Sequence, residues 1–91
     1  MPGQVHCAHI LVKTEQEAKA ILARLAKGEK FANMAREVSL CPSGKRGGDL
    51  GTFGRGKMVK EFEKAAFALM KGETSPIVKT KFGHHIIKRL E

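Results

Sequence analysis

The chain has 91 residues, of which 42% are hydrophobic and 29% charged, values typical of one folded domain over residues 1–91 rather than of a disordered segment. Its 17 Lys and Arg against 9 Asp and Glu give a net charge of +8, which favours encounters with acidic proteins, anionic membrane surfaces or nucleic acid. With five Phe but no Tyr or Trp, base stacking has little support, so nucleic acid is not the expected partner. No apolar run is long enough for a membrane span and no signal peptide is visible, so we expect a cytoplasmic protein.

The first half of the chain predicts one strand followed by two helices. Residues 5–12 form an apolar run with β-branched ends, typical of a strand. Thr14 and Glu17 have the spacing of a capping box, and apolar residues at helical spacing follow as far as Gly28, which predicts a helix ending there. A shorter helix is expected over about 30–39, with Phe31 facing inward.

The second half begins with a loop. Residues 42–56 include six glycines, with room for a short strand at 50–53. A helix is expected at 59–70, an edge strand at 74–79 and a final strand at 84–90. This order predicts an α+β fold in which the first and last strands are both apolar enough to be central.

Three kinds of site can be weighed against this pattern. The segment GTFGRGK (51–57) resembles a phosphate-binding loop, but Met58 stands where Ser or Thr would hold Mg²⁺. Soft metal ligands occur without any recognised metal-binding spacing, so no metal site is predicted; they are His6, Cys7, His9, Cys41, His84 and His85. A Cys–His hydrolase pair using Cys41 lacks an evident oxyanion device. Two cysteines are also too few for a disulfide framework.

Two histidines stand out together. His9 and His85 each lie between aliphatic residues of a predicted central strand. Either one alone is best explained as a hydrogen-bonded core residue. Two adjacent buried imidazoles could not both be charged cheaply, so we expect neutral rings joined by a hydrogen bond. Such a polar pair in so small a core suggests a functional site.

The sequence as a whole resembles the parvulins, a family of peptidyl-prolyl cis/trans isomerases. The resemblance covers essentially the whole chain, from HILVK (9–13) through FANMAREVSLCPSGKRGGDLG (31–51) and FGRGKMVKEFEKAAFAL (53–69) to FGHHIIK (82–88). It implies a four-stranded antiparallel sheet surrounded by about four helices. It also implies an isomerase that needs no metal or other cofactor.

The resemblance also implies roles for individual residues. The polar, catalytic group corresponds to His9, Cys41, Thr80 and His85, which we expect to form one network. The proline ring would sit among Leu50, Met58 and Phe62, with Phe82 adjoining. Met58 and Phe62 are four residues apart and would share a helical face if the helix starts early. Because other parvulins carry Asp at the position of Cys41, that side chain is expected to act through hydrogen bonding rather than covalently.

The expected substrates are proline-containing unfolded or flexible polypeptides. Lys13 leads directly into the first helix without the basic cluster of phosphate-directed parvulins, so we expect apolar residues before proline and no phosphate requirement. The lysines near the predicted helix at 59–70 and near the last two strands could form a patch for an acidic protein or an anionic membrane surface. A monomer is expected. The alternative function is a catalytically weak chaperone that only binds proline segments.

Overall fold

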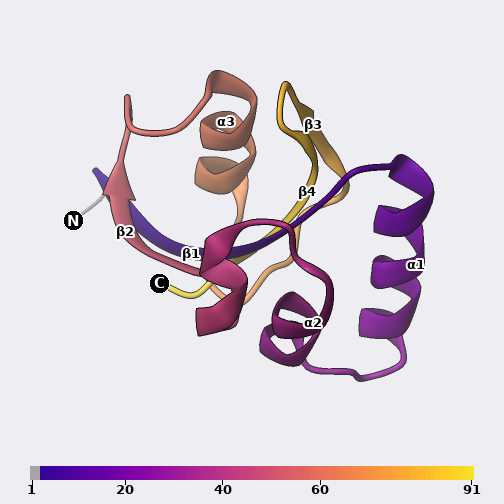
Figure 1. The fold of residues 1–91 in the computed structure, drawn as a ribbon. Helices are drawn as coiled ribbons and strands as arrows, with labels where there is room; N and C mark the ends of the chain where they lie inside the picture. Colours follow the sequence, from indigo (N-terminus) through magenta and orange to yellow (C-terminus); the bar gives the residue numbers. More distant parts are fainter. Residues whose placement is uncertain (1–2) are drawn as a thin grey trace.

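The computed structural model describes residues 3–91, and four antiparallel strands form its centre (Figure 1). They are β1 (Gln4–Val12), β2 (Asp49–Gly54), β3 (Val78–Thr80) and β4 (Gly83–Arg89), arranged in the order β2-β1-β4-β3. The prediction that the first and last strands are central is therefore confirmed. It follows from their near-continuous apolar sequences, which suit strands covered on both faces.

The predicted strand at 74–79 is shorter than expected. Only Val78–Thr80 pairs as a strand, and Thr74 forms an isolated bridge with Lys88. Between them, Pro76 has no N–H to donate. The backbone N–H of Ser75 still bonds the carbonyl of Ile87 at 2.7 Å, and the Ser75 hydroxyl accepts the N–H of Ile87 at 3.0 Å. The segment thus follows β4 without a regular ladder.

The helices are α1 (Glu15–Ala26), α2 (Phe31–Val38) and α3 (Lys60–Ala68), within about two residues of the predicted bounds. A fourth, short 3₁₀ helix, η1 (Pro42–Arg46), forms inside the glycine-rich stretch that was predicted to be a loop. The capping box of α1 is confirmed. Thr14 Oγ1 accepts the N–H of Glu17 at 3.1 Å, and Glu17 Oε1 accepts the N–H of Thr14 at 3.0 Å.

The helices cover both faces of the sheet (Figure 1). On one face α1 and α2 pack over the β1 residues Ala8, Ile10 and Val12. On the other face α3 packs over Val5 and Cys7. Strict alternation of side chains along β1 therefore divides the apolar core into two layers, one on each face of the sheet.

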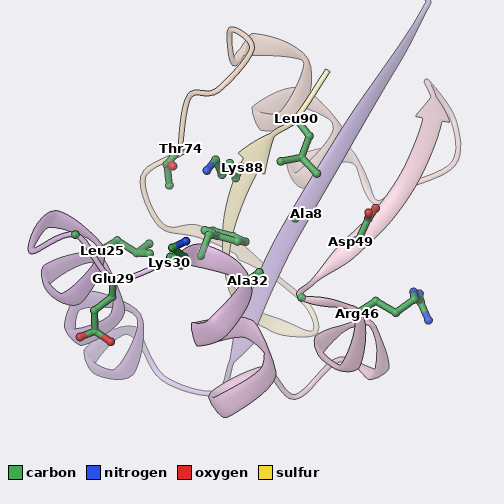
Figure 2. Close-up of a pocket in the computed structure, with 13 residues that line it drawn as sticks. Ala8, Leu25, Glu29, Lys30, Ala32, Arg46, Asp49, Thr74, Lys88 and Leu90 are labelled. Atoms are coloured by element: carbon green, nitrogen blue, oxygen red, sulfur yellow. The ribbon is translucent and has the colours of Figure 1, made fainter.

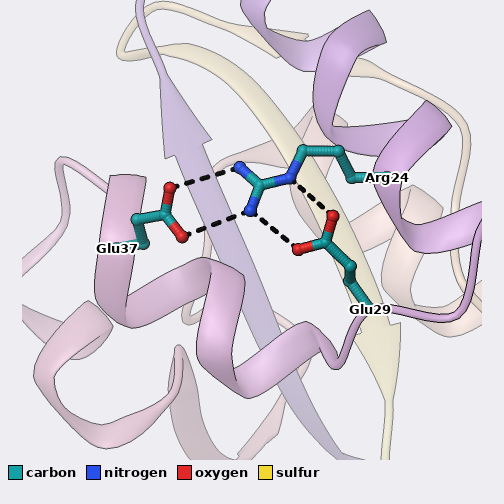
Figure 3. A network of polar contacts seen from close by, with 3 residues as sticks. All are labelled: Arg24, Glu29 and Glu37. Carbon is teal, nitrogen blue, oxygen red and sulfur yellow. Dashed lines mark hydrogen bonds and ion pairs between the residues drawn. The ribbon is translucent and has the colours of Figure 1, made fainter.

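An exposed ion-pair network joins α1 to α2 (Figure 3). The guanidinium of Arg24 donates to both carboxylate oxygens of Glu29 at 2.8 and 2.7 Å and to those of Glu37 at 3.2 and 3.3 Å. This fork-like geometry holds the turn between the two helices. Among the helices of residues 3–91, none is both long and apolar enough to cross a bilayer.

A glycine determines how the central strand meets the segment before β2. The β1–β2 ladder breaks between His6 and Ala8, and beyond the break the N–H of His9 bonds the carbonyl of Gly48 at 2.9 Å. Gly48 has φ = 84°, and a Cβ there would lie 2.3 Å from the carbonyl oxygen of His9. Only glycine fits this approach. The glycine-rich stretch therefore packs against β1 at Gly48.

Candidate active site

Two buried histidines meet on the α3 face of the sheet. His9 lies on β1 and His85 on β4, where Leu11 is the Cα partner of His85, so the two histidines are offset by two residues along adjacent strands. Their Nδ1 atoms are 3.0 Å apart, and the rings stack with centroids 5.2 Å apart. Since both side chains are buried, this hydrogen bond lies in the core. The predicted pairing of two imidazoles is present in the structure.

Thr80 extends the pair into a chain of hydrogen bonds. Its Oγ1 lies 2.7 Å from His85 Nε2 and accepts the backbone N–H of Phe82 at 3.1 Å. Because each neutral ring has one N–H, the chain can run in either direction. In one direction the spare group is an N–H at His9 Nε2, which has no partner among residues 3–91; in the other it is the Thr80 hydroxyl hydrogen. Either way the network has one unused donor.

Burial keeps both imidazoles neutral. Desolvation, and to a lesser extent the neighbouring His85, lowers the pKa of His9 from 6.5 to about 4. Desolvation also lowers the pKa of His85, with a smaller contribution from the charge of His84. At neutral pH the site therefore offers dipoles and hydrogen-bonding groups rather than a positive charge.

The aromatic ring of Phe62 packs against both histidines. Phe62 on α3 contacts His9 and His85 edge-on, with centroid distances of 5.4 and 5.3 Å and interplanar angles of 80° and 81°. The ring of Phe62 also lies near that of Phe53 of β2, with the two centroids 6.1 Å apart. Phe62 is 2% exposed, so one ring both fills the core and forms the wall of the site.

A hollow of about 500 Å³ opens in front of these rings. Seven of the eight predicted site residues line it: His9, Cys41, Leu50, Met58, Phe62, Phe82 and His85. Thr80 lies behind, bonded to His85. The sequence analysis missed further apolar lining from Leu11, Leu40 and Val59. Of these, Leu11 could have been found, because it shares the strand face of His9.

The early helix start that would have placed Met58 beside Phe62 does not occur, and the expectation for Cys41 was wrong. Helix α3 begins at Lys60, so Met58 lies before the helix and does not share a helical face with Phe62. Cys41 does not join the histidine network. It precedes η1, and its Sγ accepts the Ser43 hydroxyl at 3.3 Å. The unpredicted helix η1 turns the chain here and brings Ser43, rather than a histidine, to the thiol.

Other chemistries have little support in this arrangement. No group of three His, Cys, Asp or Glu residues within 3–91 converges as a metal site would require. The second thiol, Cys7, is fully buried, and burial raises its pKa to about 11, so it is not a nucleophile at neutral pH.

Four of the basic residues near α3 and the last strands line different hollows. Lys57 lines the hollow beside the histidines, while Lys60 and Lys64 line a shallow groove along α3. Lys88 lines a different hollow on the opposite face of the sheet. The guanidinium of Arg89 is turned toward the protein and donates to the carbonyl of Leu69 at 2.7 Å. The positive charge is therefore divided among several surfaces.

The chain is similar to known proteins in sequence and fold. Residues 9–91 match the family model described as the PPIC-type PPIase domain, or rotamase. The chain is 56% identical over 86 residues to the foldase protein PrsA of Geobacillus kaustophilus, covering 93% of this chain but 31% of that relative. It thus spans about a third of the length of such relatives.

Solved structures agree in fold. Pin from the psychrophilic archaeon Cenarcheaum symbiosum is 55% identical, with a TM-score of 0.87 over 100% of this chain and 95% of that one. PrsA from Bacillus subtilis has a TM-score of 0.95 at 47% identity, over 98% of this chain and 35% of that one. The family match, the sheet order and the buried histidine pair lead to one conclusion: the chain belongs to the PPIC-type PPIase domain family, the parvulins.

Proposed function

We propose that this chain is a peptidyl-prolyl cis/trans isomerase that assists the folding of proline-containing polypeptides. The single observation that carries the proposal is the apolar hollow closed at its back by the neutral His9–His85 pair. Its apolar lining by Leu50, Met58 and Phe62 suits a proline ring. The reaction forms and breaks no covalent bond, and the proposal assigns no metal or cofactor.

The apolar hollow would itself lower the barrier to rotation. Uncatalysed X–Pro isomerisation takes tens to hundreds of seconds, because twisting the amide breaks its resonance. The planar amide is the more polar state, so its transfer from water into an apolar pocket costs more than that of the twisted amide. The pocket would therefore bind the transition state better than either planar isomer.

The neutral polar groups complete the mechanism. Once its lone pair is no longer shared with the carbonyl, the proline nitrogen becomes a hydrogen-bond acceptor. The histidine–threonine network has one unused donor, at His9 Nε2 or at the Thr80 hydroxyl. We propose that this network supports the twisted amide through its dipoles. Cys41, bonded to Ser43, adds polarity at the edge of the hollow and makes no covalent bond to substrate.

The lining also supports a substrate class. Exposed Leu40 and Phe82, each 61% accessible, extend the apolar surface beyond the proline seat. Among residues 3–91, Lys57 alone lines the hollow with a charge when the histidines are neutral. A phosphate clamp needs converging cations. We therefore propose a preference for apolar residues before proline, with no phosphate requirement.

Exchange NMR on a short Leu-Pro peptide tests this function. Catalytic amounts of the protein should bring cis/trans exchange from the uncatalysed tens of seconds or longer to well below about a second. A peptide with phosphoserine before proline should not be exchanged faster than its unmodified twin. Binding without accelerated exchange would instead support the alternative function, a chaperone that holds proline segments.

A further inference from the structure

A second hollow lies on the sheet face opposite the histidine pair (Figure 2). Its volume is about 570 Å³. The turn between α1 and α2, the end of η1, the central strand β1 and the last residues of β4 surround it. We call it the basic hollow, because Lys30, Arg46 and Lys88 lie on its walls. None of the residues proposed for isomerisation reaches it.

The positive charges of the basic hollow are offset only in part by the protein, because the charge of Arg46 contributes to the lowered pKa of the Asp49 carboxyl. Lys30, Arg46 and Lys88 make no ion pair with any carboxylate in the described part of the chain. The two acids on its walls are occupied elsewhere. Both oxygens of Glu29 accept hydrogen bonds from Arg24, and Asp49 Oδ1 bonds His6 at 2.7 Å and the N–H of Gly51 at 2.7 Å.

Figure 2 shows the same division in space: the carboxylate of Glu29 points away from Lys30 and Lys88. The hydrogen bond from Arg24 also lowers the pKa of Glu29, which keeps that carboxylate ionised and bound to the guanidinium. The hollow therefore presents a net positive surface to an incoming ligand.

The floor of the basic hollow is apolar. Its apolar residues include Ala8 of β1, with Leu90 beside it and Leu25 farther off near Lys30 (Figure 2). The cations come from three separate elements, the α1–α2 turn, η1 and β4. Figure 2 shows Arg46 on the other side of β1 from Lys30 and Lys88, so a compact anion could not meet all three, whereas a linear ligand with spaced negative charges and apolar groups between them could. An extended peptide with Asp or Glu and aliphatic residues has this pattern.

Two other anionic partners fit less well. Nucleic acid would need aromatic stacking surfaces, but the aromatic lining residue, Phe31, is 7% exposed. A bilayer is flat on this scale and could not bring its headgroups down to a concave floor such as Ala8. Charge complementarity and shape together favour the peptide.

We propose that the basic hollow binds acidic, aliphatic peptide segments that contain no proline. Such a site would hold a polypeptide on the face opposite the isomerase pocket. A client engaged at both faces would bind more tightly than at either alone, because the second contact is intramolecular. The proposal does not depend on isomerase activity, since neither its residues nor its ligand include those of the proline site.

Amide NMR titration with a short, end-capped Glu- and Leu-containing peptide without proline tests this proposal. We expect chemical-shift changes around Ala8, Lys30 and Lys88, and none around Met58 or Phe82. The twin peptide with Gln in place of Glu should bind at least about five-fold more weakly, and added salt should weaken the acidic peptide's binding. Equal binding of the two peptides, or shifts confined to the proline hollow, would overturn the proposal.

Matched variants test whether the acidic peptide binds at the basic hollow. The double substitution Lys30→Gln and Lys88→Gln should weaken the acidic peptide by about five-fold or more. The control, Lys60→Gln with Lys64→Gln, removes the same charge from α3 and should bind as the parent does. Equal losses in both would show attraction by net charge alone and would overturn the site. Anionic vesicles and inorganic phosphate serve as further probes, and tighter binding of either than of the peptide would also overturn it.

Discussion

The two hollows lie on opposite faces of one sheet and differ in what supports them. In the proline hollow the walls are also core: His9, His85 and Phe62 are buried and pack against one another. In the basic hollow the charged walls are the free ends of surface side chains over an apolar floor. The first site is therefore tied to the stability of the fold, whereas the second can change with little effect on folding.

Replacing a shared core residue should produce the largest difference between the faces. Phe62→Ala should lower the free energy of unfolding by about 3–5 kcal/mol, because it leaves a cavity against both imidazoles. Lys30→Gln, in the basic hollow, should change it by no more than about 0.5 kcal/mol. Urea denaturation measures both values, and similar effects of the two substitutions would contradict the distinction.

Low pH should also destabilise the protein through the buried histidines. Below pH 6.5 an unfolded chain binds a proton at His9, whereas the folded chain resists it until about pH 4. Stability therefore falls as pH falls through this window, by up to about 3 kcal/mol for His9, and the lowered pKa of His85 adds in the same direction. Urea unfolding across this range measures the slope. It should be shallower in His9→Gln, and an unchanged slope would exclude His9 as the cause.

The third effect concerns the end of the hydrogen-bond chain. Thr80→Val keeps the side-chain shape but leaves His85 Nε2 and the N–H of Phe82 without their partner. We expect a loss of about 1–3 kcal/mol in stability together with reduced kcat/KM. Thr80→Ser should restore both. Failure of serine to restore activity would show that the methyl group, rather than the hydroxyl, is what the site needs.

A smaller effect is expected at the thiol. Cys41→Asp should keep the exchange rate of a Leu-Pro peptide within about ten-fold of the parent, because the side chain acts as a polar neighbour and forms no bond to substrate. Exchange NMR measures this rate. Complete loss of accelerated exchange would instead indicate covalent participation of Cys41.

The smallest effect should come from the lone cation of the proline hollow. Lys57→Gln should lower kcat/KM for a Glu-Pro peptide by about two- to five-fold, the range of an exposed charge pair, and leave a Leu-Pro peptide unchanged. Lys64→Gln, outside the hollow, is the matched control. Equal changes for both peptides would mean that Lys57 shapes the hollow rather than selecting charge.

The sequence predicted what depends on periodicity and local chemistry. Alternation along β1 places His9 on the face opposite Ile10, and the Thr14 capping box marks the start of α1. Contacts set by irregular backbone were missed. η1 gives Cys41 its partner Ser43, and the start of α3 excludes Met58 from the helix.

The basic hollow could not be predicted at all. Lys30, Arg46 and Lys88 are far apart in sequence, and each looks like an ordinary solvated residue until the fold brings them around Ala8.

Arg24 has a consequence beyond joining two helices. By holding Glu29 (Figure 3), it keeps occupied a carboxylate on the wall of the basic hollow that, once free, would compete with an acidic ligand. A substitution such as Arg24→Gln would release that competitor while touching neither hollow. Sequence variation at Arg24 would then adjust the affinity of the basic hollow without changing any residue that a ligand contacts.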